Sequence, residues 1–318
     1  MPDVAAAQGL RHTVLFYRNL PEYRAAVRHY AQAGLDNGEP VLLALPRPAV
    51  VLPAYQPALR DQVAVTDLSD LGRNPARIIP ALLAFAHARG HGGGRVRILC
   101  ESIWPGRTPA EVREASWHDG LMDRALADVP ATLVCPYSAG LPSDVLSTAA
   151  GTHPWQFGSD AFAPSPAYAE AAWPASRQQP LPSPPPDAAM IEYRSDLRPL
   201  RAMITDVGQR ARLPTGKVTD LTIAVNEIAA NTLRHTSAGG VARAWQSGGE
   251  VVCQLSDTGF IDDPMAGLRR NAIDEPGGQG LWLVNQLCDL VEIRTGAAGT
   301  VVRLHMRVPG RLWPGRRA

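Results

Sequence analysis

Residues 224–235 have the sequence AVNEIAANTLRH. Glu227 and Asn231 stand four positions apart, so their side chains share one face of a predicted helix. The apolar residues between positions 221 and 229 form the buried stripe of the same helix. A carboxylate can act as a base, and an amide oxygen suits a hard cation such as Mg²⁺. Taken alone, this pattern also fits an ordinary solvated helix face.

Two motifs further along the chain indicate a nucleotide. Asp257 follows the apolar strand predicted at 251–256 and precedes Thr258-Gly259. A carboxylate at this position can accept a hydrogen bond from an exocyclic amino group such as that of adenine. Gly259 lets the backbone approach a flat ring closely. The triplet by itself is also a common turn.

A glycine-rich stretch supplies the second motif. Gly278 and Gly280 lead into the apolar helix predicted at 280–288, whose first apolar residue is Leu281. Free amides at a helix start, next to glycines, form an anion site. Thr300, preceded by a glycine, adds a hydroxyl beside the base. Together these motifs predict that the second half of the chain binds a magnesium nucleotide.

Length and composition set the outer limits. A chain of 318 residues is expected to hold two domains. The net charge of +1 gives no electrostatic case for direct nucleic-acid binding. The four cysteines form no CxxC pair, so neither a disulfide framework nor a zinc site is indicated. Neither a membrane-spanning run nor a signal peptide is evident. We therefore expect a cytoplasmic protein without membrane contact.

The first part of the chain alternates strand and helix. We place a domain at 8–157, with strands at 13–17, 41–45, 96–100 and 131–135 and helices at 22–33, 80–88 and 109–126. Short apolar strands separated by helices predict a largely parallel α/β sheet covered on both faces. A proline-rich linker follows at 158–189. Proline removes amide donors, which predicts an extended, semi-rigid segment without a regular ladder. A long loop wrapped on one domain is the alternative.

The second domain is placed at 190–308, before a basic tail at 309–318. Its pattern predicts an α/β sandwich in which a helix layer covers one face of a mixed, mainly antiparallel sheet. The expected strands are 190–193, 240–246, 251–256, 291–295 and 300–308, and the expected helices are 196–212, 219–235 and 280–288.

Four motifs therefore follow one another along the chain: Glu227 with Asn231, Asp257 with Gly259, Gly278 with Gly280 and Leu281, and Thr300 after its glycine. Their order resembles the GHKL (HATPase) superfamily of ATPases. Within it, the likeness is greatest to the bacterial anti-sigma factor serine kinases of the RsbW and SpoIIAB type. The resemblance covers residues 190–308 and implies the Bergerat α/β sandwich. It also implies site roles: Glu227 as catalytic base, Asn231 as Mg²⁺ ligand, Asp257 with Gly259 at adenine, Gly278, Gly280 and Leu281 at the phosphate loop, and Thr300 beside the base.

The same resemblance implies a function. ATP with Mg²⁺ would be the phosphoryl donor, and a serine or threonine of a STAS-domain anti-anti-sigma factor would be the acceptor. The chain would also bind a sigma factor, as part of a partner-switching pathway that regulates transcription in a stress response. Related kinases act as dimers, so a homodimer is implied as well.

One residue departs from the family pattern. Ile261 occupies the second glycine position of the Asp-x-Gly-x-Gly turn, and a β-branched residue disfavours positive φ. This departure leaves open a non-catalytic adaptor that binds ATP or a partner without phosphoryl transfer.

Polar residues in the first domain mark a candidate sensory pocket: His12, Glu101, Cys135, Tyr137 and His153. Ligands of open parallel sheets gather at the carboxyl ends of the strands, so we expect Glu101, Cys135 and Tyr137 to form a pocket rim there, with His153 nearby and His12 just before the first strand. Residues 10–157 resemble the MEDS (DcmR-type) sensory domain, which is distantly similar to RecA-like folds. The matching residues are His12, Phe16-Tyr17, 101–107, Glu114, Cys135-Pro136-Tyr137 and His153-Pro154. The resemblance implies a sensor of a small molecule or partner. Alternatively these residues serve packing, or Cys135 pairs with a histidine as a nucleophile.

Overall fold

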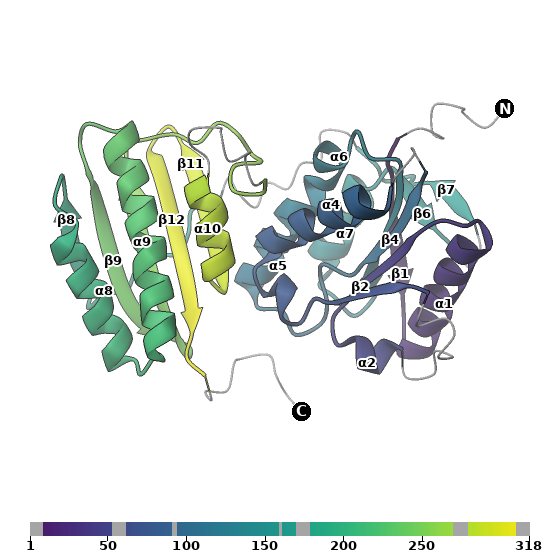
Figure 1. The fold of residues 1–318 in the computed structure, drawn as a ribbon, viewed down its shortest axis with the longest axis horizontal. Helices are drawn as coiled ribbons and strands as arrows, with labels where there is room; N and C mark the ends of the chain where they lie inside the picture. Colours follow the sequence, from purple (N-terminus) through teal and green to yellow (C-terminus); the bar gives the residue numbers. More distant parts are fainter. Residues whose placement is uncertain are drawn as a thin grey trace. The chain divides into compact units, whose positions relative to one another are not determined.

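The chain divides into two compact units in a computed structural model that describes residues 9–52, 62–90, 94–158, 161–169, 179–269 and 279–309 (Figure 1). The units are Met1–Ala175 and Ser176–Ala318. The division between them falls inside the proline-rich segment at 158–189. Each unit has its own sheet and its own helices.

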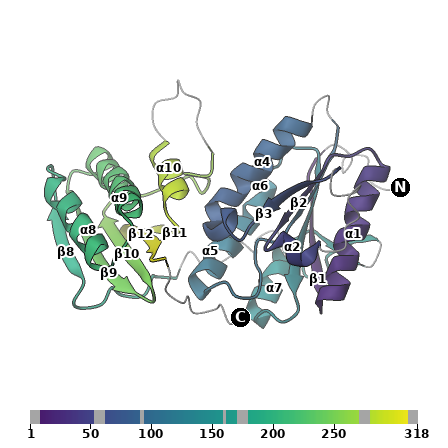
Figure 2. The same ribbon diagram turned by 60° about the horizontal axis from the view of Figure 1, so that its bottom comes forward.

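The first unit is an α/β layer structure. Its sheet has the order β3-β2-β4-β5-β1-β6-β7, and its pairings are parallel except for the antiparallel pair β6–β7. Helices α4, α5, α6 and α7 lie on one face and α1 on the other (Figures 1 and 2). The predicted parallel α/β fold is therefore confirmed. The elements are β1 Arg11–Tyr17, α1 Leu20–Asp36, β2 Val41–Leu45, α2 Pro48–Val51, β3 Ala64–Asp67, two 3₁₀ turns at Leu71–Arg73 and Pro75–Arg77, α4 Ile78–Arg89, β4 Val96–Cys100, α5 Pro109–Gly120, α6 Met122–Ala125, β5 Ala131–Ser138, α7 Ser143–Thr152, β6 Trp155–Phe157 and β7 Phe162–Pro164.

The helix predicted at 109–126 is in fact two helices. Thr108 and Glu111 form a capping box that starts α5. The helix ends at Gly120, and the amide of Leu121 turns back to the carbonyl of His118 at 3.1 Å. Glycine weakens helical continuation, which explains the break before α6.

Strand β5 runs three residues further than predicted, to Ser138. Pro136, which has no amide donor, lies within this extension. However, β4 pairs with β5 only as far as Val134, whereas β1 continues alongside to Ser138. One edge of β5 is thus free of β4 at Pro136, where a missing donor is tolerated.

Parts of the proline-rich segment lie against sheets. Phe162–Pro164 forms the edge strand β7 against β6, so the expectation that this segment forms no ladder is wrong there. Proline is tolerated at such an edge. Further along, Arg294 Nε donates to the carbonyl of Gln179 at 3.1 Å, and Arg303 donates to the carbonyl of Pro182. The later part of the segment therefore contacts the second sheet.

The second unit is a two-layer sandwich. Its sheet has the order β11-β12-β10-β9-β8, and each of these pairings is antiparallel. Helices α8, α9 and α10 lie on one face, as predicted (Figure 1). The elements are β8 Ala189–Tyr193, α8 Arg198–Arg210, α9 Thr215–His235, β9 Gly240–Ser247, β10 Glu250–Asp257, α10 Gln279–Leu287, β11 Leu290–Gly296 and β12 Gly299–Arg307.

Alternation along the strands builds the core of this unit. Leu304 and Met306 of β12 join Leu221 of α9 in one buried apolar cluster. Because side chains alternate along a strand, Arg303 and His305 point to the opposite face of the sheet. The sheet therefore has an apolar face under the helices and a polar face away from them.

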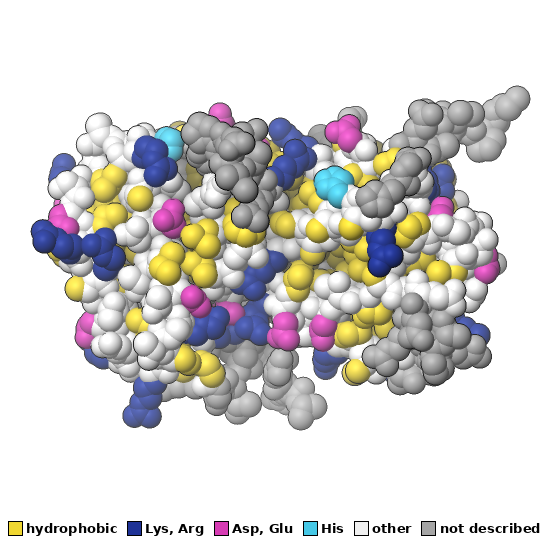
Figure 3. Space-filling view, in the orientation of Figure 1, with side chains coloured by type: hydrophobic (Ala, Val, Ile, Leu, Met, Phe, Trp, Pro, Cys, Tyr) yellow, Lys and Arg dark blue, Asp and Glu magenta, His cyan; other side chains and the backbone are white. Residues whose placement is uncertain are grey.

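Two surface properties bear on function. On the face seen in Figure 3, cationic and anionic side chains are both scattered over each unit. Within the residues that the structure describes, no helix is both long enough and apolar enough to cross a bilayer.

Candidate functional site

Helix α9 carries the first part of the predicted nucleotide site. Glu227 and Asn231 are both half-buried on it. Gly280, in the first turn of α10, faces both side chains: a β-carbon at Gly280 would lie 3.0 Å from Glu227 Oε2 and 3.3 Å from Asn231 Nδ2. The structure therefore brings together two motifs that are about fifty positions apart in the chain.

Asp257, the last residue of β10, is tied to the same helix. Its Oδ2 accepts a hydrogen bond from the hydroxyl of Thr232 at 2.6 Å. Its Oδ1 accepts from the amide of Gly259 at 2.8 Å. Each carboxylate oxygen has a second lone pair, so Asp257 can still accept from an amino group. Since Thr232 directly follows Asn231, these bonds fix the Asp-x-Gly turn beside the α9 face.

Thr300 holds the other side of this turn. Its hydroxyl donates to the carbonyl of Gly259 at 2.9 Å. A β-carbon on Gly259 would lie only 3.0 Å from Asp257 Oδ1. The close fit favours glycine at this position, and the predicted neighbourhood of Asp257, Gly259 and Thr300 is thus present in the fold.

Ile261 is accommodated without the left-handed backbone that a second glycine would allow. The described non-glycine residues with positive φ are Arg47 and Arg212. Ile261 instead donates its amide to Thr295 Oγ1 at 3.0 Å and packs partly against the core. The turn of this chain is therefore stabilised by the packing of the Ile261 side chain and by the hydroxyl of Thr295.

Two predicted phosphate-loop residues remain. Gly278 lies outside the described residues, so its role stays a prediction. Leu281 is half-buried in α10 and packs against the core of the second unit.

The residues present fit a magnesium nucleotide. Asn231 Oδ1 accepts a hydrogen bond from Arg234 at 2.8 Å, which a Mg²⁺ ion bound to that oxygen would replace. The absence of a side chain at Gly280 lets the backbone of α10 lie close to Glu227 and Asn231, where a β-carbon would meet both side chains. Carboxylate and amide oxygens are suitable partners for Mg²⁺. We call Glu227, Asn231, Asp257 and Gly280 the candidate nucleotide site.

In the first unit, four of the five predicted sensory residues converge. His12 lies in β1 and Cys135 in β5, and His12 Nε2 is 3.4 Å from Cys135 Sγ. The rings of His12 and His153 have centroids 4.0 Å apart. Tyr137 donates to Asp119 Oδ2 at 2.6 Å. His12 lies within β1 and not before it, whereas Cys135 and Tyr137 lie in the carboxyl-terminal half of β5. All three are buried, so they do not line an open rim.

Charge and burial set the protonation of this group. Burial opposes the charged form of His12, but the carboxylates of Asp123 and Asp119 outweigh it and raise the pKa of His12. Burial, with the nearby His12, lowers the pKa of His153 to about 4. Burial and the Asp119 carboxylate raise the pKa of the Cys135 thiol well above its usual value. Such a thiol is a poor nucleophile, which argues against the covalent alternative.

Glu101 has different partners. It lies just after β4 and accepts hydrogen bonds from Tyr17 at 2.7 Å and Tyr23 at 2.8 Å. Burial raises the pKa of Glu101 to about 7, although both hydroxyls oppose the shift. The predicted sensory residues are therefore held in two hydrogen-bonded groups.

Sequence reasoning missed three residues that contact the candidate site residues. Asp119 and Asp123, at the ends of α5 and α6, contact the histidine group, and Thr232 anchors Asp257. The spacing of Asp119 and Asp123 by four was an available signal, since such pairs share a helix face. Nothing local links Thr232 to a strand 25 positions away.

Comparison with known families identifies both units. Residues 11–154 match the family described as MEDS: MEthanogen/methylotroph, DcmR Sensory domain. Residues 192–306 match the Histidine kinase-like ATPase domain. The chain therefore joins a MEDS domain to a histidine kinase-like ATPase domain. Both predicted family resemblances are confirmed at this level.

One solved structure with similarity is that of the RsbU and RsbW domains of Rv1364c from Mycobacterium tuberculosis. Its sequence identity to this chain is 22%, with a TM-score of 0.30, over 40% of this chain and 35% of that chain. The chain thus spans about a third of the length of that structure. No curated protein matches this chain.

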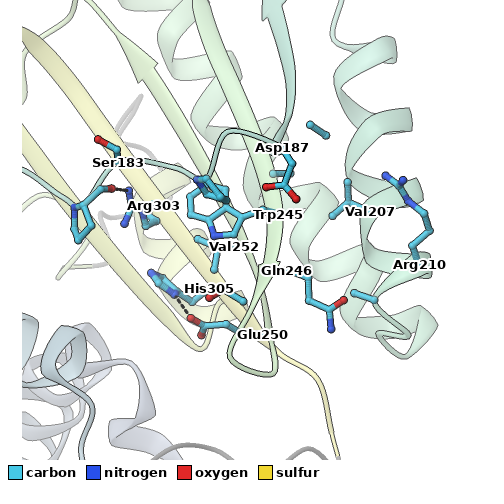
Figure 4. A pocket seen from close by; sticks show the side chains of 16 residues that line it. Ser183, Asp187, Val207, Arg210, Trp245, Gln246, Glu250, Val252, Arg303 and His305 are labelled. Carbon is cyan, nitrogen blue, oxygen red and sulfur yellow. Dashed lines mark hydrogen bonds and ion pairs between the residues drawn. The ribbon is translucent and has the colours of Figure 1, made fainter.

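A cavity of about 740 Å³ lies on the polar face of the ATPase-domain sheet. Trp245, Arg303 and His305 line it together with Pro182 of the proline-rich segment (Figure 4). None of the candidate nucleotide-site residues lines this cavity. The cavity is therefore separate from the nucleotide site of the ATPase domain.

Proposed function

We propose that this chain is an ATP-dependent protein kinase that phosphorylates a serine or threonine of a STAS-domain anti-anti-sigma factor. In this scheme the ATPase domain also binds a sigma factor and releases it to the unphosphorylated antagonist. The single observation that carries the proposal is the meeting of Glu227, Asn231 and Gly280. A candidate base, a candidate metal ligand and a glycine at a helix start then lie close together.

The chemistry assigned to these residues is simple. Glu227 accepts the proton of the acceptor hydroxyl, whose oxygen takes the γ-phosphoryl group while ADP leaves. Asn231 would hold Mg²⁺, which would neutralise charge on the phosphate oxygens. Asp257 accepts a hydrogen bond from the adenine amino group. Positioning and electrostatics supply most of the catalysis in phosphoryl transfer.

The MEDS domain is proposed to be the controlling module. A small molecule or partner would bind there and change the activity of the ATPase domain through the proline-rich segment at 158–189. A homodimer and a cytoplasmic location belong to the same proposal.

The test uses the full chain, labelled ATP, Mg²⁺ and STAS proteins encoded by the same genome. Transfer of label to one STAS protein is expected. The transfer should disappear when the acceptor serine or threonine is replaced by alanine. Measurable ATP binding without any labelled acceptor, across the complete STAS set, would refute the kinase proposal.

A second candidate function rests on Ile261. A turn stabilised by this side chain, without a second glycine, is also compatible with an adaptor whose nucleotide only shapes a partner-binding surface. The two functions differ in cells. Glu227→Ala leaves sigma factor regulation intact for an adaptor, whereas it removes inactivation of the antagonist for a kinase.

A further inference from the structure

The MEDS domain contains four metal-ligating side chains that meet at one point. His12, Asp119, Cys135 and His153 each offer one ligand atom, and these atoms all lie within 4.8 Å of one another. We call them the buried cluster, and we propose that it binds a single divalent transition-metal ion of the Zn²⁺ class. The site is separate from the magnesium nucleotide site and does not depend on kinase activity.

The distances suit a tetrahedral ion. Zn–N bonds of about 2.0–2.1 Å and a Zn–S bond of about 2.3 Å place neighbouring ligand atoms roughly 3.3–3.6 Å apart. Cys135 Sγ lies 3.4 Å from His12 Nε2, and His153 Nε2 lies 3.4 Å from Asp119 Oδ2. Two edges of the tetrahedron therefore have nearly the required length. The other pairs, at most 4.8 Å apart, need to close by about 1.5 Å or less.

A second layer of hydrogen bonds orients the two histidine ligands. His12 Nδ1 lies 3.1 Å from Asp123 Oδ2, which leaves the lone pair of Nε2 directed toward Cys135. His153 Nδ1 donates to the carbonyl of Ala149 at 2.7 Å, which leaves Nε2 directed into the cluster. Metal-bound histidines characteristically donate their other nitrogen to a carboxylate or a backbone carbonyl.

Asp119 is oriented in the same way. Tyr137 donates to its Oδ2 at 2.6 Å, and Ser102 donates to its Oδ1 at 3.3 Å. Ligating carboxylates are usually hydrogen-bonded like this. Each of the two oxygens keeps a lone pair for a metal.

An unsatisfied atom points into the cluster. His153 is fully buried, and its Nε2 has no hydrogen-bond partner among the described residues, although Asp119 Oδ2 is 3.4 Å away. A buried polar atom without a partner is destabilising. Coordination to a metal ion satisfies this atom.

Charge and ligand type select the metal. Two neutral imidazoles, one thiolate and one carboxylate carry a total charge of −2, which balances a divalent cation inside the protein. The four residues are exposed by 2% or less, so this balance is needed. Nitrogen and sulfur ligands favour Zn²⁺ and similar ions over Mg²⁺ and Ca²⁺. On binding, the Cys135 thiol releases its proton to solvent and its sulfur bonds the metal.

The experiment uses the full chain under reducing conditions, stripped with a chelator and then given Zn²⁺ or Co²⁺ alone. We expect about one ion per chain after gel filtration, and a Co²⁺ spectrum with thiolate charge transfer and strong tetrahedral d–d bands. Cys135→Ser should lose the thiolate band and weaken binding on the order of 100-fold or more. Cys100→Ser is the matched control, because Cys100 is equally buried in the same domain and lies outside the cluster.

Further variants separate ligation from folding. His153→Gln should also lose the metal, whereas His29→Gln, an exposed histidine of the same domain, should not. Asp123→Asn should weaken binding by about 10–100-fold through its effect on His12. If the cluster variants do not fold, X-ray absorption of the native chain with bound zinc tests the ligation directly. One sulfur is then expected about 2.3 Å from the zinc ion.

Three results would overturn the proposal. The first is absence of stoichiometric Zn²⁺ or Co²⁺ uptake by the native chain. The second is metal uptake that Cys135→Ser retains as fully as Cys100→Ser, and the third is an absorption spectrum without a sulfur ligand. Rapid alkylation of Cys135 in the native chain, without metal uptake, would instead favour a reactive thiol.

Discussion

The candidate nucleotide site and the buried cluster are built in opposite ways. The nucleotide site takes Glu227 and Asn231 from one helix, and both are half-buried. The buried cluster takes its four residues from two strands, the end of a helix and the residue after another helix, and solvent scarcely reaches any of them. An open site suits a reactant that enters and leaves. A closed one suits a group that stays bound, because water and competing ligands are excluded.

The largest expected effect tests the open site. Glu227→Gln should lower phosphoryl transfer to the STAS acceptor by about 10²–10⁴-fold, since the amide cannot accept the proton. ATP affinity should stay within a few-fold, because the substitution preserves size and hydrogen bonding. Initial rates at saturating ATP and Mg²⁺ measure the first quantity and calorimetry the second.

Glu192→Gln, on an exposed position of β8, is the control for that variant and should change neither quantity. The metal content of the MEDS domain should be unchanged in both proteins. Transfer by Glu227→Gln at the native rate would remove the base from the proposed mechanism, and a change in metal content would show that the two sites are coupled.

The next effect concerns the charge of His305, a buried histidine of the ATPase domain. His305 contacts Glu250 at 2.9 Å and Glu292 at 3.1 Å, and these carboxylates outweigh the opposing effect of burial and raise the pKa of His305 to about 9. The raised pKa stabilises the fold below about pH 6.5, and this contribution is lost as the pH rises through 9. His305→Gln should therefore cost about 3 kcal/mol at pH 6 and far less at pH 10.

Hydrogen exchange of β12 amides in urea, at the two pH values, measures this difference within the ATPase domain. Exchange of β1 amides serves as an internal control for the MEDS domain. An equal loss of stability at both pH values would mean that His305 acts by packing alone and that its charge contributes nothing.

A smaller effect is expected at Glu101, a buried acid of the MEDS domain. Burial raises the pKa of Glu101 to about 7, so the stability present below the unfolded pKa of about 4.5 is lost as the pH rises through 7. Glu101→Gln removes the cost of the buried charge and should stabilise the MEDS domain by about 1–2 kcal/mol at pH 8.5. Hydrogen exchange of β4 amides at pH 8.5 and at pH 4.5 measures this stabilisation. Destabilisation at pH 8.5 would show that Tyr17 and Tyr23 require the carboxylate.

The smallest effect probes the geometry of the nucleotide site. Gly280→Ala places a methyl group 3.0 Å from Glu227 Oε2 and should lower ATP affinity by about 10-fold, which equals about 1.4 kcal/mol. Gly216→Ala is the matched control, since nothing lies within 4 Å of a β-carbon there in α9. Calorimetric affinities compare the two. Equal affinities in both variants would place the nucleotide away from Gly280.

Much of the fold followed from local pattern. The strand at 96–100 begins and ends where it was predicted, and the helix predicted at 219–235 ends at the predicted residue. Alternation and the helical period are properties of neighbouring residues, so they can be read directly. Strands β3, β6 and β7 and helices α2 and α7 were not predicted. Some of these are short, and β6 and β7 exist mainly through pairing at the sheet edge.

The two sites also differ in how much of them the local pattern predicted. The helical period alone put Glu227 and Asn231 on one face, and the order of the motifs pointed to Asp257 and Gly280. The sequence carried no sign of a metal cluster. Its cysteines have no paired spacing, and the first and last proposed ligands, His12 and His153, are 141 positions apart. The register of β1 on β5 and the packing of α5 and α7 bring these ligands together. Such long-range contacts depend on how whole elements pair and pack, and the local period of a sequence does not specify them.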